Sequence, residues 1–179
     1  MCGVAFLCMS ALTRTISRRF LRNYFALAGT RVPTLEEALR NGESANVEFK
    51  RGLPDDTAKT VSVEDDLMRS IAAFANTNDG VVFIGVDDAG HVKGLDLDFQ
   101  QRDHFERRIR QLVRTRIKPT PPIQIAFDDV RGLTVAKITV ARGEAPVYMI
   151  AGVIYVRYGS ADVQAQPDDL RRLVAEFAF

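Results

Sequence analysis

The residues best suited to chemistry are carboxylates and one lysine that lie next to two short apolar segments. They are Glu43, Glu48, Lys50, Asp87 and Asp88. If the two segments are neighbouring strands of one sheet, the two glutamates and either aspartate converge beside the lysine. Carboxylate oxygens suit hard cations such as Mg²⁺ or Mn²⁺, and a lysine suits a phosphate. The pattern therefore favours a site for a metal ion and a phosphate.

The same residues also fit ordinary surface roles. Glu48 and Lys50 alternate with apolar residues, as on the solvated face of an edge strand. The two aspartates precede Gly90, as they would in a turn. Spacing alone leaves both interpretations open.

Basic residues gather between positions 102 and 118, where the chain has seven basic and two acidic side chains. Arginines three and four residues apart share one face of a predicted helix, and such a face is either solvated or a contact for phosphates. With the lysine and two further arginines, the candidate nucleic-acid contacts are Lys50, Arg51, Arg107, Arg110, Arg114 and Arg157. Arg157 fits equally well an ion pair with one of the domain's acids.

Apolar periodicity predicts the elements that position these residues. Strands are predicted at residues 46–51, 81–86, 91–95, 123–127 and 133–140, near Tyr148, and at 153–158. Helices are predicted at residues 35–40, 62–76 and 105–117 and from Pro167 onwards. The run 81–86 is so continuously apolar that we expect it in the middle of the sheet.

Two helix starts and one glycine carry more specific expectations. Thr34 with Glu37, and Ser62 with Asp65, have the spacing of capping boxes, which begin helices. Gly85 has no side chain, so the space beside it is expected to admit a ligand or another stretch of backbone.

The length of 179 residues and the apolar content of 46% indicate one globular domain. We predict an α+β domain with a mixed β-sheet flanked by helices at residues 33–179, and a basic helical extension at 1–32. Both cysteines, Cys2 and Cys8, lie in this extension, so we expect no disulfide framework and a reducing compartment. No apolar run approaches the roughly 18 residues of a membrane-spanning helix.

The first 35 residues contain five arginines and no acidic residue. Within them, residues 4–28 resemble a mitochondrial presequence or a helix that lies on a membrane surface. A helix that packs on the domain or on a partner fits as well. We expect a cytoplasmic protein, with a mitochondrial location as the alternative.

Several motifs occur in the order in which one known family has them. They are Glu43-Ser44, Val47-Glu48-Phe49-Lys50, Ala73-Phe74-Ala75-Asn76-Thr77, Ile84-Gly85-Val86-Asp87-Asp88, Val92-Lys93-Gly94-Leu95 and Tyr155-Val156-Arg157-Tyr158-Gly159-Ser160. From Glu43 to Ser160 the chain resembles the Schlafen Alba-like domain. Animal Schlafen proteins use this domain as a metal-dependent endoribonuclease for structured RNA such as tRNA. Many microbial members are described only as DNA-binding proteins or transcriptional regulators.

The resemblance implies roles for individual residues. The family's three catalytic carboxylates fall on Glu43, Glu48 and Asp87, as ligands of Mg²⁺ or Mn²⁺, and its lysine falls on Lys50. The family's paired glycine is Asp79-Gly80 here, and the zinc ligands of the animal proteins have no counterpart. Because the animal proteins form a basic cleft from two such lobes, we expect a homodimer or a second Schlafen-like subunit. The resemblance thus implies an RNA endonuclease, with a non-catalytic DNA-binding module or an incomplete subunit as alternatives.

Overall fold

The computed structural model describes residues 32–53, 58–145 and 147–176, with side chains described from residue 63 onwards in the helix that begins at 58. Apart from Val32, the predicted extension over 1–32 lies outside the described residues. So do the expectations for residues 4–28 of a presequence, a membrane contact or a packing helix. Among the described helices, none is long and apolar enough to cross a membrane.

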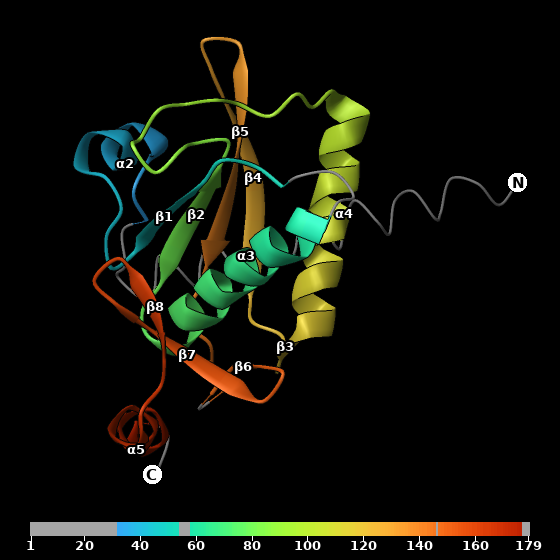
Figure 1. Cartoon of the computed structure of the whole chain (residues 1–179). Coiled ribbons are helices and arrows are strands. Elements are labelled where there is room, and N and C mark those ends of the chain that lie inside the picture. The colour runs from blue at the N-terminus through green and yellow to red at the C-terminus, as the bar shows by residue number, and fades with distance from the viewer. Residues whose placement is uncertain (1–31, 54–57, 146, 177–179) are drawn as a thin grey trace, which may run out of the picture. The chain divides into compact units, whose positions relative to one another are not determined.

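A four-stranded mixed sheet forms the centre of the domain (Figure 1). Its strands, in spatial order, are β1 (Val47–Lys50), β2 (Gly80–Ile84), β5 (Leu133–Val140) and β4 (Ile123–Val130). β1 runs parallel to β2, and the other neighbours are antiparallel. All five residues of β2 are buried, which confirms the expected central position of this apolar run.

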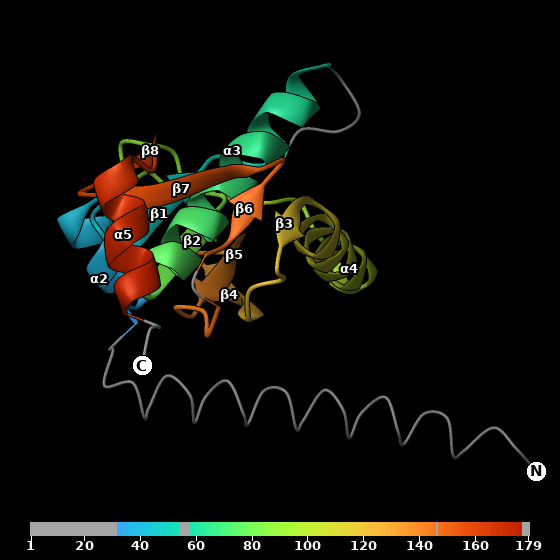
Figure 2. The same ribbon diagram turned by 90° about the horizontal axis from the view of Figure 1, so that it is seen from below.

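Helices cover both faces of this main sheet. α2 (Leu35–Asn41) packs on one face, and α3 (Ala58–Asn76) and α4 (Phe99–Arg116) pack on the other. A second, antiparallel sheet lies against the far side of α3, with the order β3 (Ile117–Lys118), β6 (Met149–Ile150), β7 (Val153–Tyr158) and β8 (Ala161–Gln164). Figure 2 shows this sheet edge on, with α5 (Pro167–Ala175) beside β7. The expected α+β fold with a mixed sheet is confirmed.

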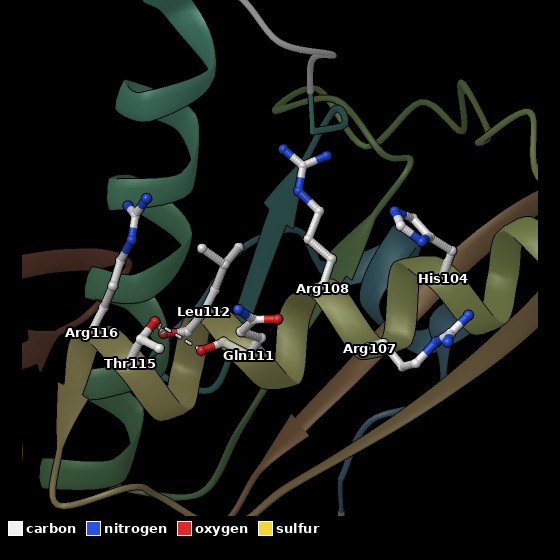
Figure 3. A pocket seen from close by; sticks show the side chains of 7 residues that line it. All are labelled: His104, Arg107, Arg108, Gln111, Leu112, Thr115 and Arg116. Carbon is white, nitrogen blue, oxygen red and sulfur yellow. Dashed lines mark hydrogen bonds between the residues drawn. The ribbon is translucent and has the colours of Figure 1, made fainter.

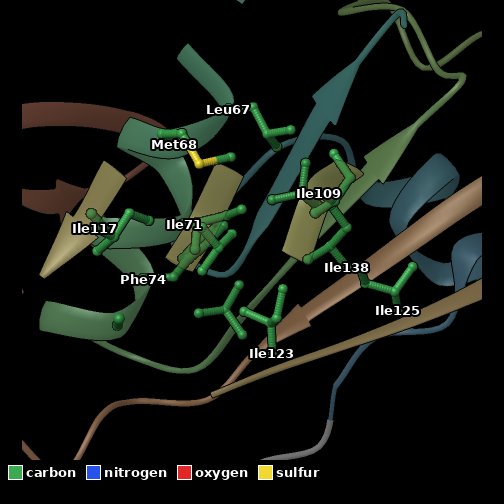
Figure 4. Packing of buried hydrophobic residues seen from close by; sticks show 14 of the residues in the cluster. Leu67, Met68, Ile71, Phe74, Ile109, Ile117, Ile123, Ile125 and Ile138 are labelled. Atoms are coloured by element: carbon green, nitrogen blue, oxygen red, sulfur yellow. The ribbon is translucent and has the colours of Figure 1, made fainter. Parts of the chain in front are cut away.

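The larger part of the core lies between the main sheet and the two long helices (Figure 4). Leu67, Ile71 and Phe74 of α3 and Ile109 of α4 are fully buried there against Ile138 of β5. The 3.6-residue spacing of these apolar positions places them on one face of each helix, so α3 and α4 bury a continuous stripe.

Of three local expectations, one is confirmed and two differ from the structure. The Thr34–Glu37 capping box is confirmed, because Thr34 accepts from the Glu37 backbone and Glu37 accepts from the Thr34 backbone. The predicted helix start at Ser62 is wrong, because α3 begins at Ala58 and no glycine or proline interrupts the intervening residues. The predicted strand over 91–95 is reduced to isolated bridges at Val92 and Leu95, because the backbone turns at Gly94, which has a positive φ of 74°.

Gly80 is the position in β2 where a side chain has no room. A Cβ at this position would overlap the ring of Phe74, which is fully buried. We expect Gly80→Ala to lower the free energy of unfolding by about 1–3 kcal/mol, as overpacked cores do. Urea denaturation measures this loss. Gly52→Ala is the control, because its Cβ would meet only Leu95 at 3.9 Å, and an equal effect of both variants would contradict the packing argument.

Candidate functional site

Glu48 lies on an edge strand, yet its side chain is buried. The pleat of β1 turns Val47 and Phe49 toward α2 and places Glu48 on the opposite face. There it is only 6% exposed, and Lys50 donates to its Oε1 atom. The interpretation of Glu48 as a solvated edge residue is therefore wrong for this fold.

Arg157 of β7 is the group that covers Glu48. Its side chain is 1% exposed, and its Nη2 atom lies 2.8 Å from Glu48 Oε2. Nη1 donates to Asp162 at 2.9 Å, and the guanidinium lies 4.9 Å from the centre of the Phe74 ring. Of the two roles left open for Arg157, the structure shows the ion pair with acids of the domain.

The second carboxylate oxygen of Glu48 carries a charge contact but accepts no hydrogen bond from a described group. Nη2 of Arg157 has two hydrogens, and it donates to the carbonyl oxygens of Ser44 at 2.9 Å and Val47 at 3.0 Å. No hydrogen of this nitrogen is left for Glu48 Oε2, although the two atoms are close. Buried oxygens rarely lack a partner, and the partner of this atom is the positive charge of Arg157.

Glu43 lies next to this pair. Its Oε1 atom accepts from the backbone N–H of Phe49 at 2.9 Å, which fixes the loop before β1 against the strand. Burial raises the pKa of Glu43 above its ordinary value, and the bond from Phe49 opposes this rise. The charges of Glu48 and Asp88 raise its pKa further, while Lys50 lowers it. The charges of three carboxylates therefore act on one another around this loop.

The raised pKa of Glu43 predicts a pH dependence of stability. The folded protein holds this proton more tightly than the unfolded chain, so stability falls as pH rises from the ordinary carboxyl range through the folded pKa. Gln keeps the acceptor for Phe49 but removes the charge. We expect Glu43→Gln to be at least as stable as the wild type at neutral pH, with its advantage lost at a pH below the ordinary carboxyl range. Urea denaturation at the two pH values tests this, and a less stable variant at neutral pH would contradict it.

Asp87 is engaged in the turn that follows β2. Its Oδ1 atom accepts from the backbone of His91 at 2.8 Å and of Ala89 at 3.1 Å, and Lys93 lies 3.2 Å from its Oδ2 atom. The backbone bond from His91 is the largest cause that lowers the pKa of Asp87, and Lys93 adds to it. Of the two expectations for Gly85, the structure shows the close approach of another stretch of backbone, because a Cβ there would meet the carbonyl oxygen of Thr134 at 3.2 Å and the backbone of Gly94 at 3.4 Å.

The carboxylates are not gathered as a three-ligand metal site. Within residues 32–53, 58–145 and 147–176, no three His, Cys, Asp or Glu side chains are placed to hold a metal ion. Mg²⁺, however, is commonly bound by one or two carboxylates together with substrate phosphates. Glu43 and Glu48 fit that kind of site. Asp88 is exposed and is not placed as a third ligand, but its charge acts on Glu43.

The arginines of α4 lie far from these acids. α4 packs along β4, where Phe105 and Phe127 have ring centroids 6.0 Å apart. β4 and β1 are the opposite edges of the main sheet, so roughly 15 Å of sheet separates them. Arg107 and Arg110 pair with acids one turn earlier on the helix, at 3.1 and 2.9 Å. The structure thus does not bring the predicted arginine face, which includes Arg114, to Glu48. Arg51 is exposed directly after β1.

Two polar residues at the end of α3 hold the second sheet in place. The side chain of Asn76 donates to the carbonyl oxygens of Tyr148 and Tyr155 and accepts from the backbone of Tyr148. Thr77 accepts from the backbone of Arg157 at 2.9 Å. These contacts fix the strand that carries Arg157, and so they position the guanidinium over Glu48.

The candidate site lies within the part of the chain that matches a known family. The family model described as Schlafen, AlbA_2 matches residues 43–166, which include both glutamates and Arg157. The chain belongs to the Schlafen AlbA_2 family. A search of curated proteins found no match.

One solved structure shares the fold of this Schlafen AlbA_2 domain, and a second is similar in sequence. The DIP2311 protein from Corynebacterium diphtheriae is 22% identical with a TM-score of 0.55, over 78% of this chain and 27% of that one. The N-terminal domain of an ATP-dependent DNA helicase RecG-related protein from Nitrosomonas europaea is 25% identical with a TM-score of 0.48, over 76% of this chain and 95% of that one. The present chain thus spans about a quarter of the DIP2311 protein.

Sequence reasoning missed two residues of the candidate site. Lys93 neutralises Asp87, and Asp162 is the second acid on Arg157. Lys93 belongs to a motif that carries the family resemblance, so its place in the chain was a usable signal. For Asp162 the sequence offers no such signal.

Proposed function

We propose that this Schlafen AlbA_2 domain is a metal-dependent endoribonuclease that acts on structured RNA such as tRNA, with Glu43 and Glu48 at the reacting phosphate. The observation that carries the proposal is the buried Glu48, whose second oxygen is held against Arg157 without a hydrogen bond. A carboxylate on a solvated face is not held in this way. Perturbed and buried acids next to a lysine are typical of catalytic sites.

Glu43 and Glu48 would hold a Mg²⁺ or Mn²⁺ ion, which when bound neutralises phosphate charge and lowers the pKa of a water ligand. Arg157 orients Glu48 and prevents it from turning away from the site. Lys50, whose side chain is 21% exposed, would exchange its contact with Glu48 for a phosphate oxygen.

Cleavage of folded RNA tests this proposal. The full chain is incubated with tRNA and, separately, with duplex DNA of similar length, each with Mn²⁺ or with a chelator. We expect fragments from tRNA in Mn²⁺ and intact tRNA with the chelator. Intact tRNA under both conditions would refute the endonuclease, and equal cleavage under both would refute its metal dependence.

The two aspartates are expected to differ in this assay. Because Asp88 acts on Glu43 whereas Asp87 is neutralised in its turn by Lys93, Asp88→Asn should slow cleavage by about tenfold or more. Asp87→Asn should change the rate less than Asp88→Asn. The family resemblance favours Asp87 instead, so a larger loss in Asp87→Asn would assign the third carboxylate to that residue.

A non-catalytic DNA-binding module is the second candidate. It is favoured by the lack of a three-ligand metal group among the described residues and by the exposed arginines of α4. This function predicts salt-sensitive binding of duplex DNA that survives Glu43→Gln and Glu48→Gln. Loss of that binding in both variants would count against it.

A further inference from the structure

Two neighbouring cavities lie along α4, away from the carboxylates. One has a volume of about 570 Å³ and the other about 560 Å³, and both are lined by His104 and Arg108. The two residues therefore stand at the junction of the cavities. A ligand that crosses this junction touches both.

The first cavity has an apolar interior. Leu53, Leu95, Leu97 and Phe105 line it, and the side chains of Leu53, Leu95 and Leu97 are only partly buried by the core. Its rim is polar, and the acids Asp96 and Asp98 line it together with Gln100. Such a lining suits a flat, largely apolar group with a few polar edges.

The second cavity is basic, with Arg107, Arg108 and Arg116 among the residues that line it (Figure 3). Arg108 and Arg116 extend from α4 toward the same side and both donate to Glu64, at 2.8 and 2.7 Å. Glu64 is 7% exposed, whereas about 30% of each arginine side chain is exposed. A guanidinium has five N–H donors, so each arginine is able to bind Glu64 and a further oxyanion together.

Arg107 adds a third guanidinium to the basic cavity. It is 67% exposed, and its ion pair with Asp103 is solvated, so a phosphate displaces that acid at little cost. The segment 102–118 contributes 7 − 2 = +5 charges, counted from its seven basic and two acidic residues. Glu64, Asp65 and Asp129 pair with three of these arginines and offset part of this excess. The remainder attracts a phosphate to the α4 side of the domain.

We infer that this double cavity binds one unpaired nucleotide of the RNA, with the base among the leucines and the phosphate at Arg107 and Arg108. The inference rests on the proposed binding of RNA and narrows the substrate to one with an unpaired nucleotide near the cleavage site. Leu53 follows Lys50 by three residues, and a chain of that length spans at most about 10 Å. The cavity is thus within a few nucleotides of Glu48.

Binding of mononucleotides to the full chain tests the inference. The probes are inorganic phosphate, ribose 5-phosphate and the four nucleoside 5′-monophosphates, titrated by calorimetry. We expect at least one nucleotide to bind about tenfold tighter than phosphate, because roughly 60 Å² of buried apolar area gives that factor. Equal affinity for phosphate and all nucleotides, or no binding of any nucleotide, would overturn the inference.

Arg107→Gln and Arg110→Gln are matched variants for the phosphate end. Both remove one exposed α4 arginine that pairs with an acid four residues earlier, but only Arg107 lines the cavity. Arg107→Gln should weaken nucleotide binding about fivefold, and Arg110→Gln less than about twofold. Equal effects would overturn the proposed phosphate position.

The outcome of the nucleotide titration is distinguishable from the outcome of the tRNA cleavage assay. Nucleotide binding by a protein that fails to cleave tRNA would refute the proposed catalysis and leave the cavity assigned. Cleavage of tRNA without nucleotide binding would refute the cavity and leave the proposed catalysis.

Discussion

Replacing Arg157 by methionine is expected to lower the free energy of unfolding by about 3–5 kcal/mol, the range found when one partner of a buried ion pair is removed. The reason is that the buried Glu48 and the half-buried Asp162 would lose the cation that they share. The carbonyl oxygens of Ser44 and Val47 would lose their donor as well. Chemical denaturation of the full chain measures the loss.

Matched variants separate charge from packing in this experiment. Arg171→Met removes an arginine that is 82% exposed and pairs with Asp168, so it should cost less than about 1 kcal/mol. Arg157→Lys keeps the charge but lacks the planar fork, so it should lie between methionine and the wild type. Adding Glu48→Gln to Arg157→Met should recover part of the loss. Arg157→Met within about 1 kcal/mol of the wild type would contradict the role given to this ion pair.

Replacing Glu48 by glutamine is expected to slow the proposed metal-dependent cleavage of tRNA by about a hundredfold or more. Glutamine has nearly the same shape, and its carbonyl oxygen still accepts from Lys50. It lacks the negative charge that a cation requires, and losses of this size follow removal of a group that stabilises a transition state. Single-turnover cleavage in Mn²⁺ measures the rate.

The control for this rate is a charge change elsewhere on the domain. Glu36→Gln removes an exposed acid of α2 that pairs with Arg40, and it should leave the rate within about twofold. Unfolding curves of Glu48→Gln show whether its domain is folded under the assay conditions. A folded Glu48→Gln protein that cleaves as fast as the wild type would show that Glu48 is structural.

Much of the fold was predictable because its apolar patterns are regular. The alternation of Val47 and Phe49 with polar residues correctly separates the two faces of β1. The start of α3 was not predictable from its capping pattern, because the sequence from Ala58 to Val61 also permits a helix. β8 was missed, because only Val163 of its four residues is a strong strand former.

The setting of the candidate site depends on contacts that no local pattern contains. Arg157 and Glu48 are more than a hundred residues apart, and only the docking of β7 against α3 brings them together. The same docking buries Glu48, which its place on an edge strand does not predict. The arginines of α4 follow Asp87 closely in the sequence. In the fold they lie at the opposite edge of the main sheet from Glu48, because α4 packs along β4.

Titration of Mn²⁺ into the full chain, followed by electron paramagnetic resonance, tests most directly whether Glu43 and Glu48 hold a divalent cation. The account predicts that the wild type binds Mn²⁺ and that Glu48→Gln binds it at least about tenfold more weakly. Glu36→Gln should bind it as the wild type does. Equal Mn²⁺ affinity in the wild type and Glu48→Gln, or no binding by the wild type, would contradict the account.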